Sequence, residues 1–139
     1  IQISYRPNKM KSNSSIVSSA LAYKILLNHW NRDTIELYEE FKVLLLNNSN
    51  EVLGIYKVSQ GGFTATIVDL RLLFATILKS GATAIITAHN HPSGKLKPSK
   101  ADILIFKKIK EICSFHEINY LDNLIITAFG NYSFTDECV

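Results

Sequence analysis

The sequence has few cysteines and no long apolar run, and each shortage argues against a class of protein. Two cysteines occur among 139 residues, Cys113 and Cys138, and they form no CxxC pair. Neither a disulfide framework nor a thiolate zinc site is therefore expected. No apolar run reaches the length of a membrane-spanning helix, and residues 1–11 lack the charged-then-apolar order of a signal peptide. We expect a cytoplasmic protein in a reducing compartment, with no membrane partner.

Charge is also sparse: 19% of the residues are charged, and the formal net charge is +3. The one local cluster of lysines, Lys107, Lys108 and Lys110, is typical of a solvated helix face. No polybasic tract supports nucleic-acid binding, which stays an alternative only. A hydrophobic fraction of 47% over this length predicts one folded domain, residues 1–139. Within it, we expect residues 1–17 to form an extended N-terminal arm.

Hydrophobic periodicity and turn residues predict alternating helices and strands. Helical spacing covers about 19–30, 69–81 and 99–115, with Ser18 or Ser19 capping the first helix, Asp69 beginning the second and Gly81 ending it. Residues 33–36 have the form of a capping box and predict a short helical turn. Strands are expected at 41–46, 51–59, 83–88, 120–128 and 132–134. The predicted fold is α+β (mixed α/β), a single curved β-sheet flanked by helices.

Two histidines, His89 and His91, follow the predicted strand 83–88. Side chains at positions i and i+2 of an extended segment point to the same face, so both rings can reach one ion. The seven residues between His91 and Ser99 let the chain turn back, which brings Asp102 in the first turn of the next helix close to the strand end. Two imidazoles, one carboxylate and a water complete a catalytic zinc site. The pattern therefore predicts Zn²⁺ bound by His89, His91 and Asp102.

Simpler interpretations exist for each part of this pattern. Ser99 and Asp102 also form S-x-x-D, an ordinary helix start, and the histidine run could be a turn. Ser99 could cap the helix, face the site, or do both. A zinc hydrolase also needs a base to take a proton from water, and the sequence alone leaves four candidates: Glu36, Glu39, Glu40 and Glu51. The HExxH and H-x-E/P-C-x-x-C signatures are absent, which argues against zincin proteases and nucleobase deaminases.

Several stretches together resemble one family. They are 39–46, Gly61-Gly62, the run H-N-H-P-S-G at 89–94, Pro98-Ser99 with Asp102, Leu121-Asp122, and 132–134. The chain resembles the JAB/MPN metalloenzymes with a JAMM motif, and specifically the C-terminal domain of RadC-type bacterial proteins, over about residues 36–135. The resemblance implies a cytidine-deaminase-like fold and a zinc-dependent metallopeptidase or isopeptidase that acts on a peptide or protein substrate.

The resemblance also implies roles for single residues. Zinc would be held by His89, His91 and Asp102, Glu39 would be the general acid/base, and Ser99 would stabilise the oxyanion. Asn123 departs from the family's L-D-H pattern, because an amide cannot shuttle protons as an imidazole does. RadC relatives are often labelled DNA repair proteins. The alternative function is therefore a non-catalytic or weakly active metal-binding module in DNA-processing assemblies. A nuclease is the third hypothesis, because a site with one carboxylate ligand suits acyl transfer better than a two-metal phosphodiester mechanism.

Overall fold

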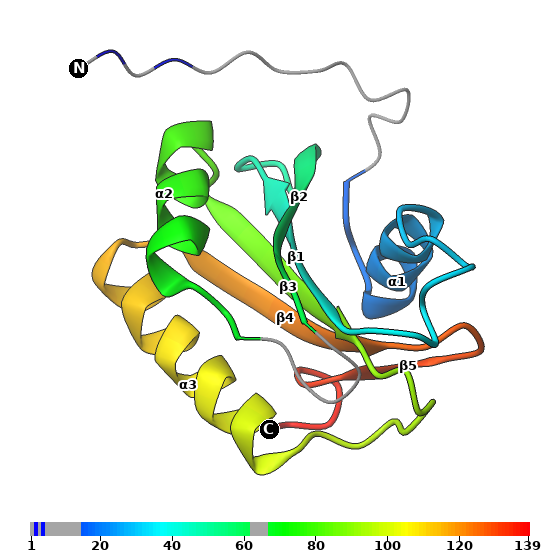
Figure 1. The fold of residues 1–139 in the computed structure, drawn as a ribbon. Helices are drawn as coiled ribbons and strands as arrows, with labels where there is room; N and C mark the ends of the chain where they lie inside the picture. Colours follow the sequence, from blue (N-terminus) through cyan, green and yellow to red (C-terminus); the bar gives the residue numbers. More distant parts are fainter. Residues whose placement is uncertain (1, 3, 5–14, 62–66) are drawn as a thin grey trace.

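The computed structural model describes residues 2, 4, 15–61 and 67–139. Within these residues one five-stranded sheet has the strand order β2-β1-β3-β4-β5. In Figure 1, α1 lies against one face of the sheet, and α2 and α3 lie against the other. The elements in chain order are α1 (Ser19–Asn28), β1 (Glu40–Leu46), β2 (Val52–Gln60), α2 (Leu70–Ser80), β3 (Ala84–Asn90), α3 (Lys100–Phe115), β4 (Asn119–Ile126) and β5 (Asn131–Ser133). The predicted α+β fold with a single sheet between helices is confirmed.

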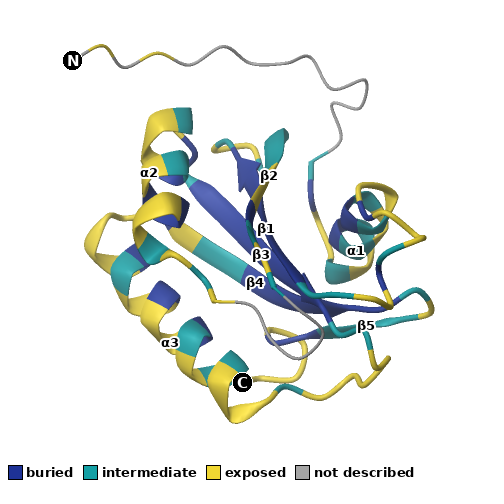
Figure 2. Cartoon of the chain, in the orientation of Figure 1, coloured by how far each residue is buried: buried dark blue, intermediate teal, exposed yellow. Residues whose placement is uncertain are grey.

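The sheet is mixed. β1 pairs antiparallel with both β2 and β3, whereas β3 and β4 run parallel and are joined through α3. β4 and β5 then form the closing antiparallel pair. Every residue of β1 and β3 is buried, as the dark strands at the centre of Figure 2 show. Central strands covered on both faces are expected to be apolar on both alternating sets, which is what the sequence 41–46 shows.

Alternation along the central strands divides the core into two layers. On the α1 face, Leu26 of α1 packs in one cluster with Leu44 and Ile86 of the sheet. On the α2–α3 face, the adjacent residues Val43 and Ile85 pack with side chains from both helices. Successive side chains of β1 and β3 therefore point into different layers of the core, and every second residue joins the same layer.

The predicted helix caps are present. Ser18 caps α1 through a hydrogen bond from the Leu21 amide at 3.1 Å. The Asp69 side chain accepts from the Leu72 amide at 3.2 Å and begins α2. Gly81 ends α2 with φ at +70°, a left-handed conformation that glycine adopts without the steric cost of a Cβ atom.

Several element ends differ from the sequence prediction: α1 ends at Asn28 rather than at residue 30, and β4 ends at Ile126 rather than at residue 128. β3 continues past Ala88, because His89 pairs with Phe41 of β1 and Asn90 pairs with Ile126 of β4. Polar residues at the end of an apolar run read as a loop from the sequence, but here the ladder continues through them.

The capping box predicted at residues 33–36 is also not formed as expected. The turn begins earlier, at Asn31, whose side chain accepts from the Asp33 amide at 2.9 Å and whose carbonyl accepts from the Ile35 amide at 3.0 Å. The segment 32–37 is a series of turns, and no helix starts at Asp33. An Asx turn two residues upstream satisfies the Asp33 amide, which the Glu36 side chain would have taken in a capping box.

Most of the predicted N-terminal arm lies outside the described residues. Its last part is placed: Ser15 forms an isolated bridge with Glu51, and the Ile16 amide donates to the Asn50 carbonyl at 2.8 Å. The Ile16 side chain is buried in the α1-face core. Across residues 15–61 and 67–139, every helix is too short or too polar to cross a bilayer.

Candidate metal centre

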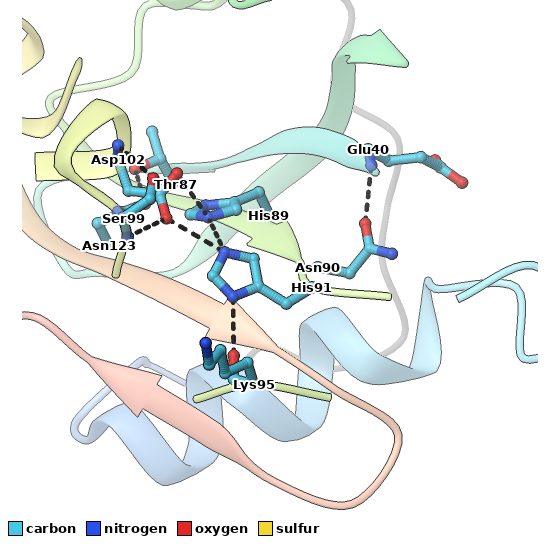
Figure 3. Close-up of polar contacts among 9 residues, drawn as sticks. All are labelled: Glu40, Thr87, His89, Asn90, His91, Lys95, Ser99, Asp102 and Asn123. Carbon is cyan, nitrogen blue, oxygen red and sulfur yellow. Dashed lines mark hydrogen bonds and ion pairs between the residues drawn. The ribbon is translucent and has the colours of Figure 1, made fainter. Parts of the chain in front are cut away.

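The two histidines lie where β3 ends. His89 is the sixth residue of the strand, and the ladder continues to His91, whose amide donates to the Ile126 carbonyl at 3.1 Å. Because the backbone stays extended, both rings project to the α2–α3 face, and their Nε2 atoms are 3.0 Å apart (Figure 3). His89 is 3% exposed, so this pair sits at the floor of the site rather than on the surface.

Asp102 reaches the same point from the first turn of α3. Its Oδ1 lies 3.3 Å from His89 Nε2, and its Oδ2 lies 3.1 Å from His91 Nε2. The same Oδ2 accepts from the Ser99 amide at 2.8 Å, while the Ser99 hydroxyl accepts from the Asp102 amide at 3.0 Å. The helix-start interpretation is confirmed, and it does not exclude the site interpretation: the carboxylate that closes the capping box also faces two imidazoles.

The loop after β3 orients the ring of His91. Its Nδ1 lies 2.7 Å from the Lys95 carbonyl, which can only accept, so Nδ1 carries a proton and, in the neutral ring, Nε2 is the nitrogen that offers a lone pair to the site. The loop turns back through Gly94, whose amide donates to the His91 carbonyl at 2.9 Å and whose φ is +79°. A backbone carbonyl that fixes the free nitrogen is the usual partner of a metal-binding histidine.

The spacing of the three groups fits a single divalent ion. One ligand atom from each of His89, His91 and Asp102 lies within 4.8 Å of the other two. Ligands bonded at 2.0–2.1 Å in a tetrahedron are roughly 3.3 Å from one another. The two Nε2 atoms are 3.0 Å apart, and the two Asp102 oxygens lie 3.3 Å from His89 Nε2 and 3.1 Å from His91 Nε2. The donor set of two imidazoles and one carboxylate suits zinc, although the same set can hold other divalent metals.

The charges at the site reinforce one another. Burial acts to raise the pKa of the Asp102 carboxyl, but hydrogen bonds from His89 and His91 and from the Ser99 amide hold it far below its usual range. Burial acts to lower the pKa of His91, but the bonds to Asp102 and to the Lys95 carbonyl, with the charges of Asp102 and Glu39, raise it above the usual value. An ionised carboxylate that faces two imidazole rings favours the binding of a cation between them.

The four candidate bases lie in different surroundings. Glu39 stands just before β1 and lines a cavity of about 240 Å³ together with Phe41, His89 and Asp102. Glu40 points to the other face, is buried, and has its Oε2 3.6 Å from Lys42 Nζ. Figure 3 shows the Glu40 side chain extending away from the histidines. Alternation at the start of β1 therefore turns Glu39, and not Glu40, toward the cavity with the proposed ligands.

The two remaining glutamates are less suitably placed. Glu51 lies in the turn between β1 and β2, where its Oε1 accepts from Asn47 Nδ2 at 3.3 Å. Glu36 is exposed and lines a separate hollow beside His91, which also includes Leu96 and Phe129. Of the four glutamates, only Glu39 shares a cavity with both His89 and Asp102 among the residues that the structure describes.

Asn123 belongs to a buried polar group beneath the histidines. It pairs with Thr87 across β3 and β4, and its Oδ1 accepts from the Thr87 hydroxyl at 2.7 Å. The Thr87 hydroxyl is also in contact with the Tyr120 hydroxyl. Within the described part of the chain, Asn123 Nδ2 and His89 Nδ1 are buried without a hydrogen-bond partner. Asn123 therefore links β4 to β3 beside His89 and makes no hydrogen bond to the three proposed ligands.

One residue of the site region was missed by the sequence analysis. Asn90 lies between the two histidines and is completely buried on the opposite face of the sheet. Its carboxamide bonds to the backbone of the segment that carries Glu39. The available signal was a polar residue with two donors and an acceptor, placed at the end of an otherwise apolar strand, where a buried polar side chain must find partners.

Comparison with known proteins agrees with this architecture. The family model described as RadC-like JAB domain matches residues 16–139. A UPF0758 protein of Flavobacterium johnsoniae is 53% identical over 100 residues, covering 72% of this chain and 44% of the relative. A UPF0758 protein of Porphyromonas gingivalis is 36% identical over 130 residues, covering 93% of this chain and 56% of the relative. The chain thus spans about half the length of these curated relatives.

The matched region contains the whole sheet, both helical layers and all three groups at the end of β3. The fold expected from the sequence, a mixed sheet with helices on both faces, is consistent with a JAB/MPN domain. On the extent of this match, the chain belongs to the RadC-like JAB domain family.

Proposed function

We propose that this domain is a zinc-dependent hydrolase of peptide or isopeptide bonds. The observation that carries the proposal is the convergence of His89, His91 and Asp102 within 4.8 Å, beside a cavity that Glu39 lines. Three protein ligands with a fourth position for solvent are typical of catalytic zinc rather than structural zinc. The family membership supports a hydrolase, and the identity of the metal is part of the proposal.

The three ligands would hold zinc, and bound zinc supplies a Lewis acid that polarises a carbonyl and makes water a nucleophile near neutral pH. Glu39 takes a proton from the attacking water at its carboxylate and delivers it to the leaving nitrogen. The water oxygen forms a bond to the carbonyl carbon as the C–N bond breaks, and the products are a carboxylic acid and an amine.

Ser99 has one hydrogen to spare for this chemistry. Its oxygen accepts from the Asp102 amide, so its O–H is free of that bond and can donate to an oxygen that gains negative charge. The cap fixes the serine beside the carboxylate, which costs no reorganisation during the reaction. We therefore assign Ser99 the stabilisation of the oxyanion.

The walls of the cavity favour a peptide over a phosphodiester. Phe41, Val68 and Ile105 line it, with the exposed Ile67 and Leu104 at its edge. Apolar walls around a few polar groups suit the side chains of a peptide. Lys108 is the one cation among the described residues lining this cavity, so a backbone of phosphates finds little charge here.

The test uses the purified chain loaded with zinc and a library of peptides from a digested proteome, including isopeptide-linked peptides. We expect new amino termini by mass spectrometry, which are absent with Glu39→Gln and present with Glu40→Gln. Metal content measured beside His89→Ala and Asp102→Ala checks the ligands. Full zinc binding with no cleaved peptide would instead favour a metal-binding module, and cleavage of a DNA oligonucleotide would favour a nuclease.

A further inference from the structure

Asn90 occupies an unusual position. It is the last residue of β3 and separates the two proposed ligands His89 and His91 along the chain. Because side chains alternate in a strand, its carboxamide lies on the face opposite to the two imidazoles. It is 0% exposed, so each of its polar groups needs a partner inside the protein.

All three partners of Asn90 are backbone groups of one segment. Its Oδ1 accepts from the Glu40 amide at 2.7 Å. Its Nδ2 donates to the Tyr38 carbonyl at 2.8 Å and to the Ile35 carbonyl at 2.7 Å. Tyr38 and Glu40 are the two neighbours of Glu39, so the Asn90 carboxamide holds the backbone on both sides of that residue. Figure 3 shows the bond to Glu40.

This segment has little other regular support. Residues 31–39 form turns and bends, and the ladder of β1 begins only at Glu40. The Glu39 carbonyl accepts from the Gly61 amide at 2.9 Å. The backbone on both sides of Glu39 is thus tied to the strand that ends in the two histidines, and Glu39 and His89 line the same cavity.

We propose that Asn90 is a positioning residue that sets the distance between Glu39 and the metal ligands. The proposal rests on the proposed function, in which Glu39 carries the proton. Asparagine suits the task because one side chain offers an acceptor for the Glu40 amide and two donors for two carbonyls. An aspartate would place a carboxylate against the carbonyls of Tyr38 and Ile35, and an alanine would leave all three groups unpartnered.

The test measures kcat and KM on a peptide cleaved in the library experiment, for Asn90→Ala, Glu39→Gln and the double variant. A misplaced base acts on the chemical step, so Asn90→Ala should lower kcat about 100-fold and leave KM within about twofold. In the Glu39→Gln background the same change should lower kcat by less than about twofold, because no base remains to be misplaced. Bound zinc should stay at the wild-type level in all three.

Asn47→Ala is the matched control. Asn47 also makes three hydrogen bonds through its carboxamide, to Ser49 and Glu51, but at the opposite end of β1. It should lower the melting temperature as an Asn90 change does and leave kcat near wild type. If Asn47→Ala loses as much activity, or if the Asn90 and Glu39 losses add, Asn90 acts through general stability and the proposal is wrong.

Hydrogen exchange of the unmodified, metal-free chain gives a readout that needs neither a folded variant nor activity. The Glu40 amide should be strongly protected and the Leu37 amide less so, because the first donates to a buried side chain and the second lies in an exposed turn. Rapid exchange at Glu40 would overturn the proposal directly. If Glu39→Gln keeps full activity instead, the proposed function fails at its base, whatever the exchange data show.

Discussion

On the α1 face of the sheet, Asn90 and Lys42 direct buried polar groups at backbone carbonyls and amides, whereas on the α2–α3 face the polar side chains at the end of β3 face one another. Asn90 uses its carboxamide on three backbone groups, and Lys42 donates to the His29 carbonyl at 2.9 Å. One residue away in the chain, His89 faces a second imidazole and a carboxylate. Adjacent residues of the same strand thus play different parts: Asn90 holds a backbone segment on one face, and His89 joins the candidate metal site on the other.

This difference shows how a candidate metal site can be distinguished from other buried polar side chains. A side chain whose hydrogen bonds go to backbone atoms fixes the position of that backbone. A group of side chains whose lone pairs point at one another is costly without a cation between them. The predictions below test this contrast with matched substitutions on the two faces.

The largest effect is expected for two aspartates on opposite faces of the sheet. Asp102→Ala removes one of the three proposed ligands and should weaken zinc binding by more than about 100-fold, beyond the loss typical of an outer partner. Asp122→Ala on the α1 face should keep zinc, because Asp122 accepts from the Ser133 hydroxyl and the Thr135 amide. It should cost about 3 kcal/mol of unfolding free energy. Competition with a chelating dye measures the zinc affinity, and urea denaturation measures the unfolding free energy. Equal zinc affinity in both variants would contradict the proposed difference between the two faces of the sheet.

The next effect concerns the neighbouring glutamates. Glu39→Gln should lower kcat by about 10² to 10⁴, the usual contribution of a general base, with zinc retained. Glu40→Gln should change kcat by less than about twofold, because its side chain lies beside Lys42 on the α1 face. Steady-state kinetics on a cleaved peptide decides. A large loss in Glu40→Gln alone would mean that the cavity lined by Glu39 is not where the proton moves.

Metal removal should lower hydrogen-exchange protection on the α2–α3 face of the sheet and leave the α1 face nearly unchanged. Zinc at about 100 times its dissociation constant should stabilise the folded chain by about 2.7 kcal/mol, and chelation should remove this. The loss of hydrogen-exchange protection should concentrate where α3 begins, since Asp102 joins that helix to β3. Protection in α1 should change little. Asp102→Ala serves as the control, because its melting temperature should not respond to the chelator.

The smallest effect separates two helix caps of equal kind. Ser99 caps α3 and Ser18 caps α1, each through one amide hydrogen bond. Alanine at either position should cost about 1 kcal/mol of stability. Only Ser99→Ala should also lower kcat, since its hydroxyl is assigned to the oxyanion. Thermal denaturation beside kinetics checks this, and parallel losses of activity in both variants would leave Ser99 as a cap alone.

Sequence patterns predicted the elements well where local chemistry decides them. Asp69 and Gly81 mark the ends of α2 because a side-chain acceptor and a left-handed residue are needed there. The strand at β3 was predicted two residues short, because its last pairs, His89 with Phe41 and Asn90 with Ile126, are made with distant segments. Local periodicity carries no information about such partners.

The candidate site divides in the same way. The spacing of His89, His91 and Asp102 was sufficient to predict that the three meet, because two-residue alternation and a helix start are local properties. The proposed base was not decided by spacing, since four glutamates remained possible from the residues alone. The face on which Glu39 lies depends on where the β1 ladder begins, and that follows from pairing with β2 and β3.

The sequence by itself determined the two-layer apolar core, the helix caps and the donor set of the site, because each depends on periods and contacts within a few residues. Tertiary structure alone decided that one carboxylate of Asp102 serves both a cap and the histidines. It alone revealed that Asn90 bonds to the backbone on both sides of Glu39, about fifty positions earlier in the chain. The reason is physical: a buried polar group must be satisfied by whatever the fold brings to it, and only the assembled sheet specifies that partner.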